Sequence, residues 1–205
     1  MKAPMRNILL AATLILLMTS MACAQQPNIL IILTDDQRHD TLNVMPNLQA
    51  LAAQGVQFTD AWTTTPLCAP SRASILTGRY ANDHGIRHNG QPNGGAVMFG
   101  ATPTIASALQ NAGYTTGLFG KYINEYDVIN PFIPPSWNEW HTFATGERYF
   151  NYYFNDNGEV SEHGSNPEEY STDMLREKVL HFMVTAPEPW FAVYAPFAPH
   201  VPQTP

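Results

Sequence analysis

Residues 28–36, NILIILTDD, decide the fold class of this chain of 205 residues. An unbroken apolar run rich in isoleucine is typical of a strand that is buried on both faces, as in a parallel sheet. We therefore predict a strand over residues 28–33. Two carboxylates, Asp35 and Asp36, follow almost at once, so polar groups lie where this strand ends.

Strand-like and helix-like stretches alternate along the rest of the chain. Further strands are expected at residues 56–63, 114–119 and 190–195, and helices at residues 46–54, 70–77, 103–112 and 172–184. This alternation predicts an α/β fold with a mainly parallel central sheet that is flanked by helices. Residues 124–170 are rich in aromatic residues, Pro, Asn and Gly, and are expected to form a long excursion with room for a small hairpin.

The N-terminus has the three parts of an export signal. Lys2 and Arg6 give a positive start, residues 8–18 are apolar, and Ala22-Cys23-Ala24 is an A-x-A cleavage site. We predict a signal peptide over residues 1–24 and an exported protein, periplasmic or secreted. The apolar run is shorter than the ~20 residues that span a bilayer, so no transmembrane span is expected. Lipid attachment through Cys23 is the less favoured alternative.

The charge of the chain argues against nucleic acid as a partner. The formal net charge is -7, and it becomes -9 once Lys2 and Arg6 are removed with the signal peptide. A chain this acidic does not attract nucleic acid through bulk charge. Any anion must therefore be bound by a local cluster of cations.

The predicted strands bring several reactive side chains toward one edge of the sheet. In parallel sheets, ligands bind beyond the carboxyl ends of the strands. The groups that follow these ends are two carboxylates, a thiol, a lysine and a histidine: Asp35, Asp36, Cys68, Lys121 and His200. We expect them to share one rim.

Cys68 is the single cysteine that remains after removal of the signal peptide. It is either a buried, inert side chain or a reactive group. Its predicted place before a helix that starts at Pro70 favours an anion there, so we expect a stabilised thiolate. Arg72, one turn further on, can fold back toward it.

The other rim residues also have two interpretations. Asp35 and Asp36 suit a hard cation, Ca²⁺ or, less favoured, Mg²⁺, but one of them could cap a helix while the other is solvated. Lys121 and His200 suit the oxygens of a sulfate or phosphate, but each alone could be an ordinary surface residue.

Four segments of this sequence together resemble the sulfatase family. CAPSR at residues 68–72, followed by ASILTGRY, resembles its signature C-x-P-S-R with T-G-R. PNILIILTDDQR at 27–38 resembles its first strand with the metal-binding Asp pair. GLFGKYINEY at 117–126 and APFAPHVP at 195–202 resemble its G-K-[WY] and P-H-x-P segments. The resemblance covers residues 27–205 and implies an alkaline-phosphatase-like sandwich.

The resemblance also implies a role for each matching residue. Cys68 is converted by a formylglycine-generating or anaerobic sulfatase-maturing enzyme to formylglycine, whose hydrate attacks the sulfur of a sulfate ester. Its second hydroxyl then loses a proton and expels sulfate. Asp35, Asp36 and the modified Cys68 bind Ca²⁺, and Arg72 holds the hydrate. Lys121 and His200 bind the sulfate oxygens or serve the leaving group.

Two details point to a subgroup that acts on sulfated sugars. Many family members have a His two residues after the lysine, but this chain has Ile123 there, followed by Asn124. GKYINEY and IPPSWNEW instead resemble N-acetylglucosamine-6-sulfatases and the extracellular endo-6-O-sulfatases of heparan sulfate. In that interpretation Asn124 takes over part of the polar role in substrate binding.

The aromatic residues of the excursion leave two interpretations open. They could stack on sugar rings, or they could form a packed cluster under a long loop. The residues concerned are Trp137, Trp140, Tyr149 and Tyr152.

The chain is shorter than the family that it resembles. Family members continue with a further Asp-Asn metal pair, another sulfate-binding lysine and a C-terminal subdomain. We therefore expect residues 25–205 to be the N-terminal part of a truncated sulfatase catalytic domain, incomplete in metal ligation. The alternatives to a sulfatase are a phosphonate or phosphate monoester hydrolase of the same superfamily and a non-catalytic carbohydrate-binding remnant.

Overall fold

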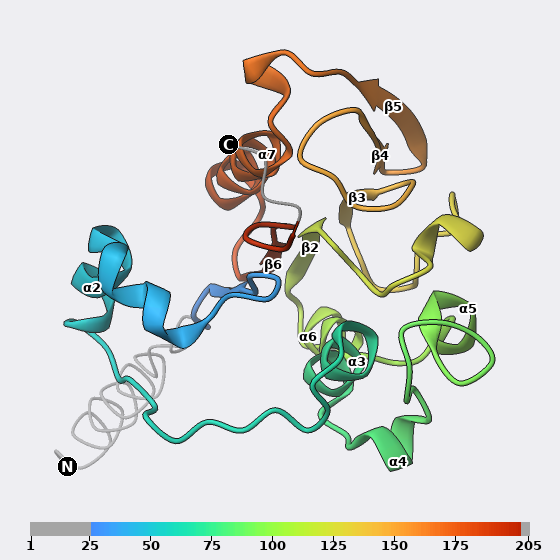
Figure 1. Ribbon diagram of the computed structural model, residues 1–205, viewed down its shortest axis with the longest axis horizontal. Coiled ribbons are helices and arrows are strands. Elements are labelled where there is room, and N and C mark those ends of the chain that lie inside the picture. The colour runs from blue at the N-terminus through green and yellow to red at the C-terminus, as the bar shows by residue number, and fades with distance from the viewer. Residues whose placement is uncertain (1–25, 202–205) are drawn as a thin grey trace, which may run out of the picture.

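The computed structural model describes residues 26–201, so the predicted signal peptide over residues 1–24, with Cys23, lies outside the described residues. The strands are β1 (Ile29–Ile32), β2 (Thr115–Gly120), β3 (Glu139–Phe143), β4 (Tyr152–Asp156), β5 (Glu159–His163) and β6 (Trp190–Ala195). The α-helices are α2 (Pro46–Ala52), α3 (Cys68–Thr77), α4 (Ala81–His84), α5 (Gly95–Phe99), α6 (Ile105–Asn111) and α7 (Ser171–Thr185) (Figure 1). Short 3-10 helices lie at His39–Val44, Tyr126–Val128 and Pro167–Glu169.

The six strands form one sheet in the order β1-β6-β2-β3-β4-β5. The pairs β1–β6, β6–β2 and β2–β3 are parallel, while β4 and β5 form an antiparallel hairpin at the far edge. Strand β6 lies between β1 and β2 and aligns Val193 with Ile31 on one side and with Leu118 on the other. The prediction of a mainly parallel sheet in an α/β fold is confirmed.

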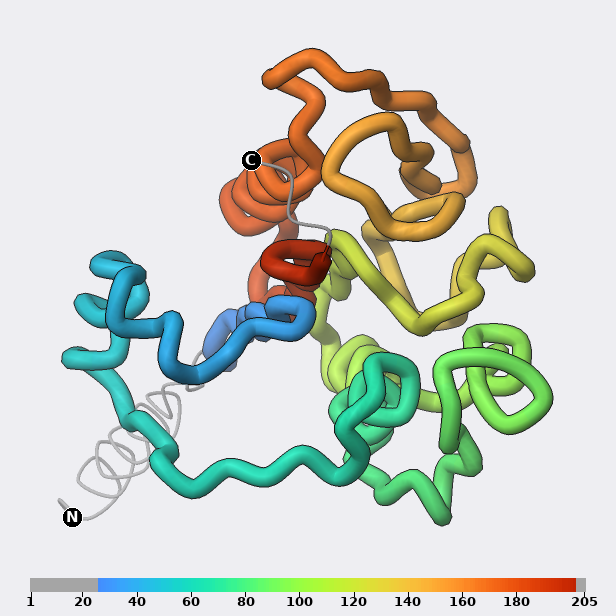
Figure 2. Tube along the Cα trace, viewed as in Figure 1, coloured from blue at the N-terminus to red at the C-terminus, as the bar shows by residue number. Residues whose placement is uncertain are grey.

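Helices cover both faces of the sheet, as Figure 2 shows. On one face α7 packs against β2 and β6, with Phe182 in contact with the rings of Phe119 and Trp190. On the other face α3 and α6 pack through small side chains, such as Ala73 and Ala106, in the cluster that contains Leu118. An apolar layer therefore packs on each face of the sheet, and the carboxyl ends of the strands are left for polar groups.

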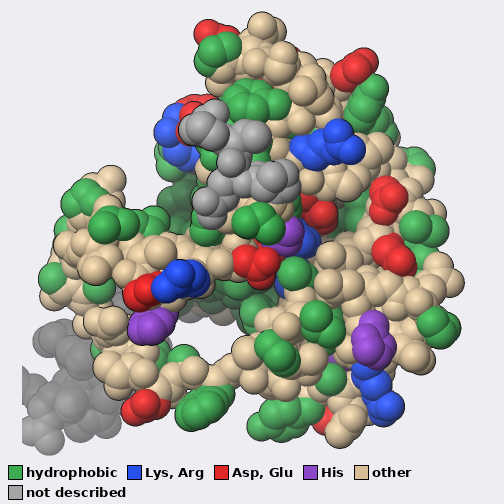
Figure 3. Space-filling view, viewed as in Figure 1, with side chains coloured by type: hydrophobic (Ala, Val, Ile, Leu, Met, Phe, Trp, Pro, Cys, Tyr) green, Lys and Arg blue, Asp and Glu red, His purple; other side chains and the backbone are tan. Residues whose placement is uncertain are grey.

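The predicted strand at residues 56–63 is wrong. This segment is irregular and pairs with no described strand, and Val56 and Trp62 are 82% and 91% exposed. Together with α2 it forms an arm that stands away from the main body (Figure 3). Its alternating apolar pattern is genuine, but a strand also needs a neighbour that takes its hydrogen bonds, and none of the described residues supplies one.

Sequence analysis also missed one strand, and it placed the starts of α3 and α6 two residues away from where they lie. β3 lies inside the excursion at 124–170 and extends the parallel sheet, whereas the hairpin expected there is present as β4 and β5. Helix α3 begins at Cys68 and not at Pro70, with Leu67 as the residue before it. Cys68 is therefore the first residue of the helix.

The aromatic residues of the excursion are packed inside the protein. Trp137, Trp140, Tyr149 and Tyr152 are all buried. The indole Nε1 of Trp140 donates to the hydroxyl of Tyr126 at 3.0 Å. The packed cluster is thus the correct interpretation, and rings this deeply buried cannot stack on a sugar.

Candidate active site

The side chain of Asp35 is the centre of the rim cluster. Its carboxylate accepts a hydrogen bond from Lys121 Nζ at 2.8 Å and lies 3.3 Å from Arg72 NH2, and all three side chains are buried. The thiol of Cys68 points at the same carboxylate, with 3.7 Å between Sγ and Oδ1. Burial alone raises the pKa of Asp35, but the charges of Arg72 and Lys121 outweigh it and hold the pKa below its ordinary value.

The ends of two strands fix Lys121 and Asp35 at this position. Gly120, the last residue of β2, has φ of +115°, and a Cβ there would lie 2.0 Å from the carbonyl oxygen of Ala195. Only glycine fits this close approach of β2 and β6, so Lys121 starts directly at the open end of the sheet. The Arg72 guanidinium also donates to the Lys121 carbonyl at 2.7 Å, which ties α3 to the same strand end.

His200 is held at the rim by two aromatic residues. The hydroxyl of Tyr149 donates to the carbonyl of His200 at 2.6 Å. The ring of Phe197 stacks on the imidazole with 4.7 Å between centroids, and Lys121 Nζ lies 5.9 Å from the centroid of the same ring. Sequence reasoning missed both positioning roles. Phe197 could have been found from its place three residues before His200, but Tyr149 lies 51 residues away and carries no such signal.

The environment of the Cys68 thiol differs from our expectation. Burial raises its pKa, and the charges of Asp35 and Asp36 add to this effect while Lys121 opposes it. This direction contradicts the expected stabilisation of a thiolate, because desolvation and the two carboxylates raise the pKa of the thiol more than Lys121 and Arg72 lower it. Asn89 accepts the Ala69 N–H at 2.9 Å, so one of the free amides at this helix start is already used.

Asp36 and Asn124 lie at the margin of the cluster. Asp36 has φ of +58°, its side chain is 60% exposed, and its Oδ2 lies 3.4 Å from His200 Nε2. Asn124 is half-buried, and among residues 26–201 its side-chain oxygen has no hydrogen-bond partner. The structure thus brings Asp35, Cys68, Arg72, Lys121 and His200 together with Asp36 beside them, and it shows no polar contact from Asn124 to these groups.

The donor atoms of the cluster suit a cation. Asp35, Cys68 and His200 each offer one ligand atom, and these atoms lie within 4.8 Å of one another. The adjacent carboxylates of Asp35 and Asp36 fit a hard cation in chemistry, but two carboxylates supply only part of the 6–8 oxygens that Ca²⁺ takes. Figure 3 shows acidic, basic and histidine side chains gathered at the centre of this face.

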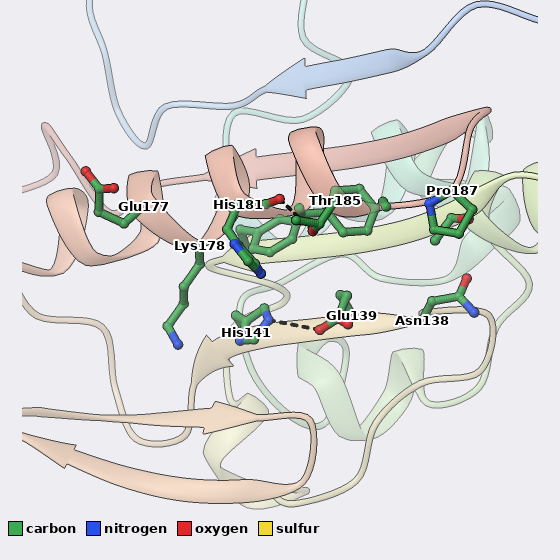
Figure 4. Close-up of a pocket in the computed structure, with 12 residues that line it drawn as sticks. Asn138, Glu139, His141, Glu177, Lys178, His181, Thr185 and Pro187 are labelled. Carbon is green, nitrogen blue, oxygen red and sulfur yellow. Dashed lines mark hydrogen bonds and ion pairs between the residues drawn. The ribbon is translucent and has the colours of Figure 1, made fainter.

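A separate cavity of about 540 Å³ lies between α7 and β3 (Figure 4). His141, His181, Lys178 and Glu139 line it, and none of the rim residues does. The imidazole of His141 lies 2.6 Å from Asp156 and 3.2 Å from Glu139, and Lys178 pairs with Asp156 at 2.9 Å. These contacts fasten the hairpin and α7 to β3, so we assign them a structural role.

Helix α3, which carries Cys68, contacts the neutral side chain of His84. His84 Nδ1 accepts the Ile86 N–H at 3.1 Å, and its Nε2 lies 3.0 Å from Ser74 Oγ of α3. A nitrogen that accepts carries no proton, so protonation of the ring breaks the first contact. Burial accordingly lowers the pKa of His84 below its ordinary value of 6.5.

We expect His84 to make stability depend on pH. The unfolded chain binds this proton more readily than the folded one, so the stability that neutral His84 contributes is complete above pH 6.5 and falls as pH drops below it. Urea unfolding at about pH 7.5 and about pH 5.5 should show a lower midpoint at the acidic pH. This change in urea midpoint between the two pH values should be smaller in His84→Gln. It should stay the same in His181→Gln, the control, which changes an exposed side chain of α7. An equal change in all three proteins contradicts the role assigned to His84.

Comparison with known proteins identifies the family. A family model described as Sulfatase matches residues 27–205. The chain belongs to the sulfatase family. Its relatives include the extracellular sulfatase SULF-1 homolog of Drosophila melanogaster, 40% identical over 166 residues, which cover 78% of this chain and 15% of that protein. They also include human N-acetylglucosamine-6-sulfatase, 34% identical over 199 residues, which cover 89% of this chain and 36% of that protein.

Solved sulfatase structures share the fold. One, a complex with the substrate D-glucosamine-2-N,6-O-disulfate, superimposes with a TM-score of 0.75 at 25% identity, covering 88% of this chain and 36% of that one. The alkaline-phosphatase-like architecture expected from the sequence is thereby confirmed. This sulfatase-family chain spans about a third or less of the length of these relatives. Within residues 26–201, no helix is long and apolar enough to cross a membrane.

Proposed function

We propose that this chain is the N-terminal part of an exported sulfatase that removes sulfate from a sulfated sugar of the glucosamine-6-sulfate kind. The observation that carries the proposal is the cluster around Asp35, whose carboxylate contacts Cys68 and the two buried cations Arg72 and Lys121. A sulfate ester is an anion, and buried cations that are held in place before it binds are the groups that stabilise charge at its oxygens. The sugar class is supported by the relatives that are named for glucosamine 6-sulfate chemistry.

Each residue of the cluster has a role in this proposal. Cys68 is modified to formylglycine, whose hydrate supplies the attacking oxygen and a second hydroxyl for release of sulfate. Lys121 and His200 bind the sulfate oxygens. Asn124, whose side-chain oxygen has no hydrogen-bond partner among residues 26–201, binds the sugar. Arg72 orients the modified residue, because it lies one helical turn after Cys68 and is fixed by Asp35.

Asp35 and Asp36 would hold the Ca²⁺ that the family implies, with further oxygens from other groups. When bound, the ion supplies positive charge beside the sulfate. In the structure the Asp35 carboxylate pairs with the Lys121 ammonium. It is therefore already in a position where it can bind a positive ion. Export, to the periplasm or the medium, is part of the proposal through the N-terminal signal.

The first experiment is mass spectrometry of the peptide that contains Cys68, from protein made in its native host. Formylglycine replaces the elements of hydrogen sulfide by one oxygen, so the peptide becomes lighter. Protein from the gene's full reading frame is then assayed on matched sulfate and phosphate esters of one alcohol. Preferred hydrolysis of the sulfate ester supports the proposal. An unmodified cysteine, or preferred hydrolysis of the phosphate ester, contradicts it.

We expect Tyr149→Phe to lower kcat/KM by roughly threefold to tenfold, because it removes a single hydrogen bond to the backbone of His200 while keeping the ring. The loss should appear in kcat more than in KM if His200 serves the leaving group. Tyr153→Phe, which removes a hydroxyl at the surface of β4, is the matched control and should leave both constants unchanged. Equal effects of the two changes would show that Tyr149 does not position His200.

A further inference from the structure

The cluster contains a set of donor atoms that an oxygen-binding cation does not need. One sulfur, one imidazole nitrogen and one carboxylate oxygen, from Cys68, His200 and Asp35, lie within 4.8 Å of one another. Calcium takes oxygen ligands, whereas sulfur with nitrogen is the combination that selects Zn²⁺ and similar softer metals. The unmodified cysteine therefore gives this site a different metal preference from its formylglycine form.

The hydrogen bonding of His200 leaves one ring nitrogen free for a metal. Nδ1 lies 2.5 Å from the carbonyl oxygen of Val201, and a carbonyl only accepts, so Nδ1 carries the proton. In the neutral ring, Nε2 then presents its lone pair. Backbone hydrogen bonds of this kind orient the histidine ligands of metal sites and set their tautomer.

The free nitrogen faces a group that cannot donate to it. Nε2 lies 3.4 Å from Asp36 Oδ2, so a lone pair and a carboxylate point at each other unless a positive charge lies between them. A proton on Nε2 is one solution, and a metal ion is the other. Before a metal binds, the carboxylates of Asp35 and Asp36 balance the charges of Arg72 and Lys121. The Cys68 thiol adds a third negative charge when it loses its proton to a bound ion.

The spacing of the donors needs only a small adjustment. With metal–ligand bonds of about 2.0–2.3 Å, the ligand atoms of a tetrahedral zinc site are about 3.3–3.8 Å apart. Cys68 Sγ and Asp35 Oδ1 already lie 3.7 Å apart. All three ligand atoms lie within 4.8 Å of one another, so shifts of about 1 Å in the partly exposed side chains of His200 and Cys68 bring them to this spacing.

We propose that the chain with unmodified Cys68 binds Zn²⁺ through Cys68 Sγ, His200 Nε2 and Asp35 Oδ1, with Asp36 beside the ion. On binding, the Sγ–H bond breaks, its proton goes to the buffer, and the sulfur electron pair forms the bond to the metal. Nothing is oxidised or reduced. This site belongs to the state before formylglycine formation, and it does not depend on sulfatase turnover.

The test uses the chain with both cysteines confirmed intact by mass spectrometry, and Co²⁺ as the spectroscopic probe. We expect a thiolate-to-cobalt absorption band in the near ultraviolet, which Zn²⁺ abolishes and which Ca²⁺ at the same concentration leaves unchanged. Cys68→Ser should remove the band, and His200→Ala should weaken Co²⁺ binding by more than about tenfold. Cys23→Ala and His181→Ala are the matched controls and should keep the band; His181 lies at the separate cavity (Figure 4).

A second measurement does not require a ligand variant to fold. In the Cys23→Ala chain, Zn²⁺ should slow alkylation of Cys68 by iodoacetamide by at least about tenfold, and a chelator should restore the rate. A band that persists in Cys68→Ser, or alkylation that Zn²⁺ does not slow, overturns the proposal. Either result leaves the proposed sulfatase function untouched, because that function depends on the formylglycine form.

Discussion

Cys68→Ala is expected to lower sulfate ester hydrolysis by more than about 10⁴-fold in protein made from the full reading frame, since loss of a catalytic nucleophile costs this much or more. The physical reason is that the alanine side chain cannot become an aldehyde hydrate. The cations Arg72 and Lys121 remain in place around the site, so substrate binding should weaken far less than turnover. The measurement is kcat and KM on a 6-sulfated glucosamine substrate.

The control for this change is Cys23→Ala, which removes the other cysteine of the chain. It should leave the activity per mole of purified protein unchanged. Alanine at position 68 is small and suits a helix, so the variant should keep its stability, and circular dichroism can verify this. If Cys68→Ala retained activity within a few-fold of the parent protein, Cys68 would not be the nucleophile and the proposed mechanism would fail.

The parts of the fold that the sequence predicted are those whose pattern is local. Residues 190–195 form β6 with the predicted bounds, and α7 differs from its prediction by one residue at each end. In both, the apolar side chains that define the period are the ones that pack on the sheet, so local pattern and tertiary burial agree. The correct strand predictions also placed the rim residues, because Asp35 and Lys121 lie at the carboxyl ends of strands.

The predictions from the sequence that are wrong concern segments whose structure depends on residues far away in the chain. Residues 56–63 have the pattern of a strand, but their exposed side chains show that the pattern alone does not supply a partner. β3 was missed because its five residues lie in a stretch rich in Pro, Asn and Gly, where so short a run does not stand out from a loop. Its place in the sheet depends on distant residues, such as Asp156 of the neighbouring strand, which contacts His141 at 2.6 Å. The raised pKa of Cys68 likewise depends first on its burial and then on the charge of Asp35, which lies 33 residues away in the sequence.

Asp35→Asn should lower the free energy of unfolding by about 3–5 kcal/mol, the usual cost of removing one partner from a buried ion pair. Asp35 neutralises two buried cations, with Lys121 Nζ at 2.8 Å and Arg72 NH2 at 3.3 Å. An asparagine side chain can still accept a hydrogen bond, but it carries no negative charge. Among residues 26–201, Asp35 is the only buried carboxylate in contact with Arg72 and Lys121, so both cations would lose their ion-pair partner. Urea unfolding of the two proteins at neutral pH measures the difference.

Asp36→Asn is the matched control, because it makes the same chemical change at the next residue. The side chain of Asp36 is 60% exposed and its one ion-pair contact is His200, so we expect a change within about 0.5 kcal/mol. The contrast separates a buried charge partner from a solvated one within a single Asp pair. Equal losses in the two variants would mean that Asp35 is not the residue that compensates Lys121 and Arg72, and that the charges of the cluster are balanced by water or by other groups.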